Sequence, residues 1–218
     1  MKKKEEKTMK ILFFGDSITD ASRIRDNDDS LLALGGGYVR DVATLLYAES
    51  PNRYVIRNRG ISGNRIVDLY ARVKADCWNC NPDLISILIG VNDVWHEINH
   101  NNGVEIERFE KVYRMLIEDT LAKLPSVKIV LCEPFVLEGE ATTEKYERFL
   151  EVKNYAKVVK KLAKEYGLYF LPLQEKLDES AKAHGAKVYL KDGVHPTFAG
   201  ANLIAQEWLK LFKKEIEK

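Results

Sequence analysis

Five short apolar runs alternate along the chain with longer segments in which hydrophobic residues recur at helical spacing. The apolar runs are residues 11–14, 54–57, 84–89, 128–132 and 169–171. The first, third and fourth runs are almost continuous in apolar residues, which is typical of central strands buried on both faces of a parallel sheet. The amphipathic segments between the runs predict helices at residues 39–47, 66–75, 106–123, 145–166 and 199–216.

Strands that alternate with helices predict an α/β fold, because each parallel connection crosses a face of the sheet through a helix. Five such strands indicate a three-layer α/β/α sandwich around a flavodoxin-like, five-stranded parallel sheet. Functional residues of such sheets lie at the carboxyl ends of the strands. We expect residues 1–9 to form a flexible basic tail and residues 10–218 to form a single domain.

Charge and hydropathy exclude several classes of function. The 34 basic and 33 acidic side chains leave a net charge of +1, so charge gives no reason to expect nucleic-acid binding. The basic N-terminus is followed by only a short apolar run, too short for a signal peptide. No stretch approaches the roughly 20 apolar residues of a membrane span. We therefore expect a cytoplasmic protein with no membrane partner.

The three cysteines do not predict a metal or redox site. Cys77 and Cys80 form a C-x-x-C pair, but a structural zinc site needs a second pair of ligands. Thioredoxin-type pairs open a helix after a strand, whereas this pair follows a predicted helix. An odd number of cysteines also suits a reducing compartment. We interpret the pair as two incidental thiols and expect neither a metal nor an organic cofactor.

Ser17 is the candidate nucleophile, because Gly15-Asp16-Ser17 directly follows the first predicted strand. A simple helix N-cap is the alternative that these three residues leave open. A serine hydroxyl needs a base, commonly a histidine held by a carboxylate. Of the four histidines, His195 has Asp192 three positions before it, in a loop ahead of the last predicted helix. That spacing lets the carboxylate bind Nδ1 while Nε2 faces the serine.

Two further polar motifs follow the second and third predicted strands and can supply hydrogen-bond donors to an oxyanion. Residues 58–64 contain glycines, which let the backbone approach a ligand closely. Residues 90–93 contain Asn92, whose side-chain amide is a donor. Each motif alone is an ordinary turn. Because the three motifs follow three successive strands, we expect them to meet at one edge of the sheet.

The order of these motifs resembles that of the SGNH hydrolases, also called the GDSL family. The blocks GDS, SGN, GxND and DxxHP span the chain from about residue 11 to the last helix, with GDSI in place of GDSL at an apolar packing position. The resemblance implies the SGNH hydrolase fold, with Ser17 as nucleophile, His195 as base and Asp192 as its orienting partner. It also implies an oxyanion hole formed by the N–H groups of Ser17 and Gly63 and the amide of Asn92.

The segments GDSITD, LGGGY, RGISGN and IGVNDVW resemble the intracellular acetyl-xylan esterases within this family. The resemblance implies a serine esterase that removes acetyl groups from acetylated sugars or xylo-oligosaccharides through an acyl-enzyme intermediate. Its partner would be a small acetylated carbohydrate. We expect Asp16, Asn64, Asp93 and Trp95 to contribute to substrate binding. Asp16 and Asp93 are also suited to hold their loops through backbone N–H groups, and Trp95 is as consistent with simple packing as with stacking on a sugar.

Several alternatives use the same residues. They are a broader short-chain carboxylesterase, a thioesterase or lysophospholipase-type acyl hydrolase, an acyltransferase, and a carbohydrate-binding protein without catalysis. The sequence leaves open the acetylated sugar, the hydroxyl position and the limit on acyl-chain length. A homo-oligomer also stays open, because Trp208, Leu209 and Phe212 near the C-terminus fit either a core or an interface.

Overall fold

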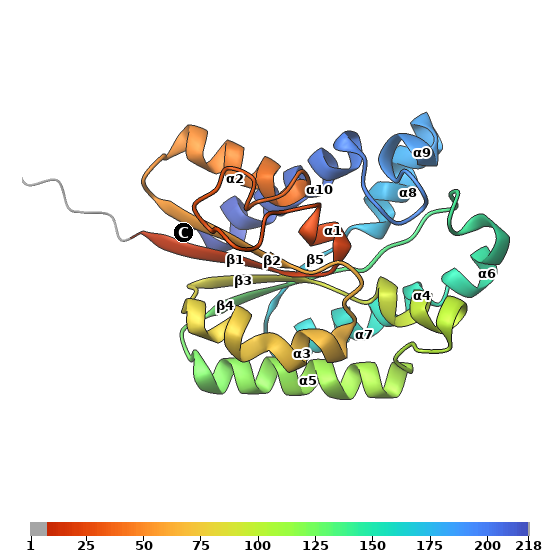
Figure 1. The fold of residues 1–218 in the computed structure, drawn as a ribbon, viewed down its shortest axis with the longest axis horizontal. Coiled ribbons are helices and arrows are strands. Elements are labelled where there is room, and N and C mark those ends of the chain that lie inside the picture. Colours follow the sequence, from red (N-terminus) through yellow and green to blue (C-terminus); the bar gives the residue numbers. More distant parts are fainter. Residues whose placement is uncertain (1–7, 218) are drawn as a thin grey trace, which may run out of the picture.

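A five-stranded parallel sheet organises the chain, for which the computed structural model describes residues 8–217 (Figure 1). The strands are β1 Met9–Gly15, β2 Tyr54–Gly60, β3 Leu84–Leu88, β4 Lys128–Cys132 and β5 Tyr169–Leu171. Their order in the sheet is β2-β1-β3-β4-β5, and every neighbouring pair is parallel. The predicted flavodoxin-like sheet is confirmed.

Helices cover both faces of this sheet (Figure 1). On one face lie α1 Ser17–Asp20, α2 Tyr38–Glu49 and α10 Phe198–Leu211, and on the other lie α3 Ile66–Asp76, α5 Ile106–Lys123 and α7 Val152–Glu165. The remaining helical segments are η1 Trp78–Cys80, α4 Val91–His100, η2 Thr143–Lys145, α6 Tyr146–Phe149, α8 Gln174–His184, α9 Ala186–Tyr189 and the π-turn η3 Phe212–Ile216. None of the helices within residues 8–217 combines the length and hydrophobicity needed to cross a bilayer.

Burial of the strands follows their place in the sheet. Every residue of β3 is buried, whereas the edge strand β2 alternates between buried and half-buried positions. Trp208 and Phe212 stack with ring centroids 5.0 Å apart and are 1% and 0% exposed. The Trp208 Nε1 group donates to Ser86 Oγ on β3 at 3.0 Å. These C-terminal aromatic residues, and the buried Leu209 between them, therefore belong to the core rather than to an interface.

The strand register aligns the loops that carry the polar motifs. Gly15 at the end of β1 pairs with Gly60 of β2 and Leu88 of β3. The three following loops therefore start side by side at one edge of the sheet. The predicted tail, residues 1–9, lies largely outside the described residues, but its proposed end is wrong, because Met9 already pairs with Tyr54 in β1.

Two helical predictions need correction. Residues 90–93, which alone resemble an ordinary turn, instead start α4, and Asn92 and Asp93 are buried in its first turn. The helix predicted at residues 145–166 is divided into α6 and α7, and the division leaves Phe149 buried against Trp95, with ring centroids 5.7 Å apart. The pattern did not predict α8, in which Leu177 alone is buried and no apolar stripe exists.

Candidate active site

Ser17 is the first residue of α1, directly after the central strand β1. Asp16 caps this four-residue helix, since its Oδ1 accepts the N–H of Ile18 at 2.9 Å. The N-cap alternative thus applies to Asp16 and leaves the Ser17 hydroxyl available for another contact. Ser17 Oγ lies 2.9 Å from Nε2 of His195.

Asp192 and His195 lie in a tight loop between α9 and α10. Asp192 Oδ1 accepts the backbone N–H groups of Val194 at 3.0 Å and of His195 at 2.8 Å. Its other oxygen, Oδ2, lies 2.7 Å from His195 Nδ1. Because the carboxylate engages Nδ1, Nε2 is left to accept the proton of Ser17. The three side chains form one continuous hydrogen-bonded chain.

Hydrogen bonding decides the charges of the Asp192–His195 pair. Burial acts to raise the pKa of Asp192, but the hydrogen bonds from the His195 ring and from two backbone N–H groups outweigh it and hold the pKa at about 2. The hydrogen bond to Asp192 in turn raises the pKa of His195 above its ordinary value of 6.5. Asp192 is therefore ionised at neutral pH, and it favours the imidazolium that forms when His195 takes a proton.

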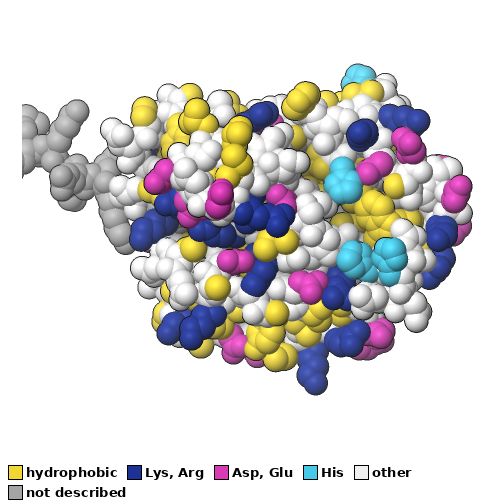
Figure 2. Space-filling model, viewed as in Figure 1, with side chains coloured by type: hydrophobic (Ala, Val, Ile, Leu, Met, Phe, Trp, Pro, Cys, Tyr) yellow, Lys and Arg dark blue, Asp and Glu magenta, His cyan; other side chains and the backbone are white. Residues whose placement is uncertain are grey.

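The other three histidines do not contact Ser17. His96 and His100 both lie on α4, with their ring centroids 6.0 Å apart, and His100 is the last residue of that helix. His184 ends α8 and is exposed. Figure 2 shows histidine side chains and a hydrophobic patch gathered where the strands end, beside a group of Lys and Arg side chains over the middle of the face.

The loops after β2 and β3 bring the predicted oxyanion donors to the same edge of the sheet. Gly63 has a φ of +83°, and an added Cβ would meet nothing within 4 Å. No hydrogen bond formed within residues 8–217 uses the backbone N–H of Gly63 or of Ser17. The Nδ2 of Asn92 donates to the carbonyl of Asn64 at 3.1 Å, which leaves its second hydrogen for another acceptor. Gly90, with a φ of +134°, starts the helix that carries Asn92.

The side chains of Asp16 and Asp93 accept hydrogen bonds from backbone N–H groups, and their contact with a substrate stays a prediction. Both are 0% exposed. Asp93 Oδ1 accepts the N–H of Ile66 at 3.0 Å and so anchors the start of α3. Burial raises the pKa of Asp16 to about 7 and that of Asp93 to about 8. Both carboxyl groups bind backbone N–H groups, which is the second role that the sequence suggested for them.

Asn64 and Trp95 have different surroundings. The Asn64 side-chain oxygen accepts from Arg72 Nε at 2.7 Å, so this amide supports the loop. The half-buried Trp95 ring lies 5.8 Å from the His195 ring, centroid to centroid, and borders the hydrogen-bonded chain.

A cavity of about 370 Å³ opens directly on the Ser17–His195 pair. Gly36, Gly37 and Tyr38, the first residue of α2, line part of this cavity. The other residues that line the cavity are Ile18, Ala21, Ser22, Ser62 and Pro196. Apart from Ile18, Pro196 and His195, the lining residues are glycine or alanine or carry hydroxyl groups, which suits a small polar molecule better than a long acyl chain.

Sequence reasoning missed the residues that hold the loops in place. Asp20 and Arg72 contact the loop after β2 from two sides, and a segment after β4 binds the loop of Asp192. In that segment, the N–H of Leu137 donates to the carbonyl of Gly193 and that of Ala141 to the carbonyl of Asp192, both at 2.9 Å. In the sequence, Asp20 appears only as the last residue of the GDSITD segment. No local spacing indicates a role for Arg72 or for the segment after β4.

Neither the cysteines nor the acidic side chains form a metal site in the described part of the chain, where no group of three or more His, Cys, Asp and Glu residues is suitably placed. Cys77, Cys80 and Cys132 are all free. Burial raises the pKa of Cys77 to about 12, so its thiol is not reactive at neutral pH. Cys80 Sγ donates to the carbonyl of Asp76 at 3.4 Å.

Comparison with known proteins gives consistent matches over nearly the full length. Residues 13–203 match the GDSL-like Lipase/Acylhydrolase family. An acetylxylan esterase from Geobacillus stearothermophilus is 37% identical over 208 residues, which cover 92% of each chain. A crystal structure from Parabacteroides merdae, described as a GDSL-like lipase, has a TM-score of 0.90 at 38% identity and covers 95% of this chain and 97% of that one.

A crystal structure of an acetylxylan esterase from Geobacillus stearothermophilus has a TM-score of 0.85 at 36% identity, and the match covers 95% of both chains. Three further structures of that esterase are described as catalytic mutants. They carry alanine in place of an aspartate, a serine or a histidine.

Proposed function

This chain belongs to the GDSL-like lipase/acylhydrolase family, and we propose that it is a serine esterase that removes acetyl groups from acetylated sugars such as xylo-oligosaccharides. The observation that carries the proposal is the hydrogen-bonded chain beside the cavity. In it, Ser17 Oγ lies 2.9 Å from His195 Nε2 and His195 Nδ1 lies 2.7 Å from Asp192. A nucleophile, its base and the carboxylate that orients the base are the three groups that acyl transfer needs.

The proposed reaction begins when His195 Nε2 accepts the Ser17 proton and Oγ attacks the carbonyl carbon of the acetyl ester. The carbonyl oxygen becomes negatively charged and is bound by the N–H groups of Ser17 and Gly63 and by the second amide hydrogen of Asn92. As this tetrahedral intermediate collapses, the ester C–O bond breaks, and the imidazolium gives its proton to the leaving sugar oxygen.

Acetyl-Ser17 is then hydrolysed by the same groups. Water gives a proton to His195 as its oxygen attacks the acyl carbon, and a second oxyanion forms in the same place. The Ser17 oxygen leaves, takes back the proton and releases acetate. Asp192 stays ionised throughout and stabilises the imidazolium at each stage.

Two observations favour a small acetyl ester over a long acyl chain. The cavity of about 370 Å³ beside Ser17 is lined in large part by glycine, alanine and serine residues and by Tyr38. The Geobacillus relative is an acetylxylan esterase. Trp95, half-buried beside His195, offers a ring face that suits stacking on a sugar.

Ser17→Ala tests the proposal. We expect the wild-type protein to release acetate from acetylated xylo-oligosaccharides, and we expect the variant to lose at least about 10⁴-fold in kcat, as when a catalytic serine is removed from other hydrolases. An unchanged thermal unfolding midpoint serves as the control for folding. Acetate release by Ser17→Ala at the wild-type rate would exclude Ser17 as the nucleophile.

The substrate class is tested separately with wild-type protein. Rates on 4-nitrophenyl acetate, butyrate and octanoate should fall in that order, because the cavity is small. A higher rate on octanoate than on acetate would favour a lysophospholipase-type hydrolase or a thioesterase. Transfer of acetyl to an added sugar acceptor, measured by product analysis, would identify an acyltransferase.

A further inference from the structure

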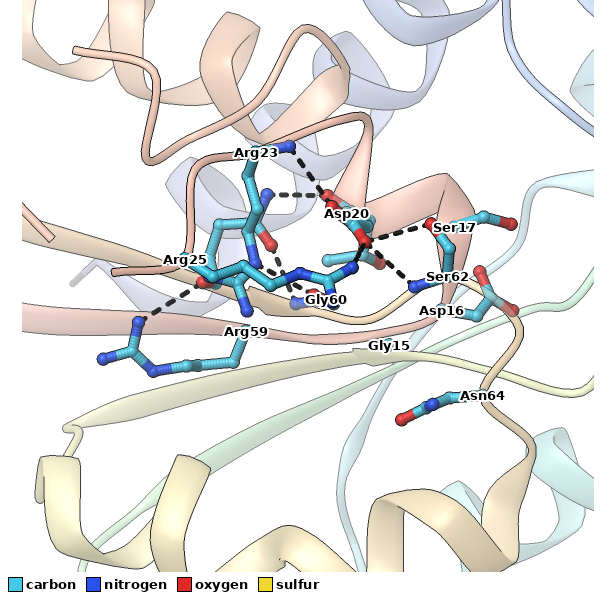
Figure 3. A network of polar contacts seen from close by, with 12 residues as sticks. Gly15, Asp16, Ser17, Asp20, Arg23, Arg25, Arg59, Gly60, Ser62 and Asn64 are labelled. Carbon is cyan, nitrogen blue, oxygen red and sulfur yellow. Dashed lines mark hydrogen bonds and ion pairs between the residues drawn. The ribbon is translucent and has the colours of Figure 1, made fainter. Parts of the chain in front are cut away.

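We infer that Asp20 is a positioning residue that fixes the oxyanion donor Gly63 relative to the nucleophile Ser17. This inference rests on the proposed function, because it assigns a role in the same reaction. Asp20 is the last residue of α1, and Ser17 is the first, so one helical turn carries both side chains. Figure 3 shows Asp20 pointing away from β1 toward the loop that follows β2.

Asp20 is a buried carboxylate whose hydrogen bonds converge on Ser62. It is 2% exposed. Its Oδ2 accepts the backbone N–H of Ser62 at 2.9 Å and the Ser62 hydroxyl at 3.0 Å (Figure 3). The same oxygen pairs with Arg25, while Oδ1 accepts the N–H of Arg23 at 3.2 Å. Burial acts to raise the pKa of Asp20, but the bonds from Ser62 and Arg25 outweigh it and lower the pKa below the usual value.

The loop is held just before Gly63 by a second set of contacts. Arg23, 9% exposed, donates from Nε to the carbonyl of Gly60 at 2.9 Å. The N–H of Ile61 donates to the carbonyl of Gly15 at 3.0 Å. An added Cβ on Gly60 would lie 2.2 Å from the nitrogen of Asp20. The end of β2 therefore packs so closely against α1 that no side chain larger than that of glycine fits at this position.

The loop is also held just after Gly63. The Arg72 Nε donates to the Asn64 side chain at 2.7 Å, and Asn92 Nδ2 donates to the Asn64 carbonyl at 3.1 Å. The Gly63 N–H has no such contact within residues 8–217, and it belongs to the peptide group that joins Ser62 to Gly63. Its orientation therefore depends on its two neighbours, and Asp20 is the side chain that holds Ser62.

The consequence is specific to the transition state. An oxyanion donor must lie about 2.7–3.1 Å from the charged oxygen, so a shift of the loop weakens the bond that forms only as charge develops. A ground-state acetyl ester, bound mainly by the cavity, depends on this distance much less. Loss of the Asp20 clamp should therefore lower kcat and leave KM nearly unchanged.

Asp20→Asn is the test, because an amide keeps the shape of the side chain but has one acceptor oxygen to serve Ser62 and Arg23. Asp28→Asn is the matched control. Asp28 lies in the loop that follows α1, and it pairs with Arg59 at 2.6 Å without contacting Ser62. Methylboronic acid serves as the probe, since its tetrahedral adduct with a serine places a negatively charged oxygen where the oxyanion forms.

In Asp20→Asn we expect kcat to fall by about 10- to 100-fold, the range for a displaced rather than deleted donor. The inhibition constant for methylboronic acid should rise by the same factor. KM and the pH midpoint should match those of wild type, because the His195–Asp192 pair is untouched. Asp28→Asn should keep wild-type kcat and inhibition.

A folded Asp20→Asn protein with wild-type kcat, or with reduced kcat and unchanged methylboronic acid inhibition, would overturn the inference. If Asp20→Asn does not fold, Ser62→Ala replaces it, because this change removes one of the two bonds to Asp20 at an exposed residue. We then expect a smaller, parallel loss in kcat and inhibition, and wild-type values of both would overturn the inference. Wild-type protein without esterase activity would refute the proposed function and this inference together.

Discussion

The two loops that meet at Ser17 are held in place in different ways. Asp192 and His195 orient each other within one loop, because the carboxylate binds a ring nitrogen and backbone N–H groups no more than three positions away. Backbone contacts from the segment after β4 also hold this loop. The loop of Gly63 is oriented by side chains from elsewhere in the sequence, namely Asp20 and Arg72. A local spacing can therefore reveal the acid–base pair, whereas only the folded structure reveals the support of the oxyanion donor.

Among changes in these two loops, Asp192→Asn should have the largest effect, because it removes the negative charge that pairs with His195. The amide can still accept the backbone N–H groups, but it no longer presents an anion to His195 Nδ1. We expect kcat to fall on the order of 10³- to 10⁴-fold, as for the equivalent change in serine proteases. Steady-state rates on 4-nitrophenyl acetate measure the loss. A folded variant within tenfold of wild type would show that Asp192 is not the partner of the base.

Gly63→Ala should have the next largest effect, because it perturbs the loop that Asp20 and Arg72 hold in place. Gly167→Ala is its matched control. Both glycines have positive φ, +83° and +64°, and at neither would a Cβ meet an atom within 4 Å. Each change should destabilise the fold by about 1–2 kcal/mol through backbone strain.

Only Gly63→Ala should lower kcat, by about 100-fold, since only Gly63 lies at the site. Thermal unfolding and steady-state kinetics of both variants separate the two effects. Because alanine keeps the backbone N–H, equal activity in the two variants would contradict the expectation that strain at Gly63 displaces this donor.

The pH dependence of the wild-type protein probes the Asp192–His195 loop without a mutation. The reaction needs neutral His195, and its hydrogen bond to Asp192 raises its pKa above 6.5. Activity should therefore rise with pH, with a midpoint above 6.5, and should fall about tenfold per pH unit well below that midpoint. In Asp192→Asn the midpoint should move to lower pH. A wild-type midpoint at or below 6.5 would contradict this coupling.

Asp93→Asn should have the smallest effect on activity and should change only how stability depends on pH. Burial raises the pKa of Asp93 to about 8 in the folded state, from an ordinary value of 3.8. Between these values the folded protein keeps a proton that the unfolded chain has lost. The contribution of Asp93 to stability is therefore full below the lower pKa and declines, by up to about 1.4 kcal/mol per pH unit, as pH rises toward the higher one.

The amide introduced by Asp93→Asn would mimic the protonated acid and would still accept the N–H of Ile66. The free energy of unfolding of the variant should therefore fall less steeply with pH than that of wild type. Denaturant unfolding from about pH 5 to about pH 8 measures it. Identical slopes in the two proteins would show that Asp93 is ionised when folded.

Strands and the long amphipathic helix were predictable because their patterns are set by burial. The runs at 128–132 and 169–171 match β4 and β5, and the segment 106–123 matches α5. The pattern of apolar positions did not predict α4, because polar residues are buried in that helix. Asn92 and Asp93 are polar yet buried in α4, where Asn92 donates to the Asn64 carbonyl and Asp93 Oδ1 accepts the N–H of Ile66. A pattern of apolar positions does not reveal such contacts.

The candidate site was predictable to the same extent. Motifs at the ends of successive strands converge because parallel strands share one edge, so Ser17, Gly63 and Asn92 could be assigned to it. Asp20 could not, since its contact with Ser62 joins residues 42 positions apart through a buried carboxylate. The full burial of Asp16 and Asp93 depends on how α1 and α4 pack, which no local spacing specifies.

Covalent labelling tests the central claim most directly. Wild-type protein treated with a fluorophosphonate should gain one phosphonyl group, and peptide mass mapping should place it on Ser17. Ser17→Ala should gain none, and His195→Ala should react far more slowly, because its serine lacks a base. A label on another residue, or wild-type labelling of Ser17→Ala, would contradict the account.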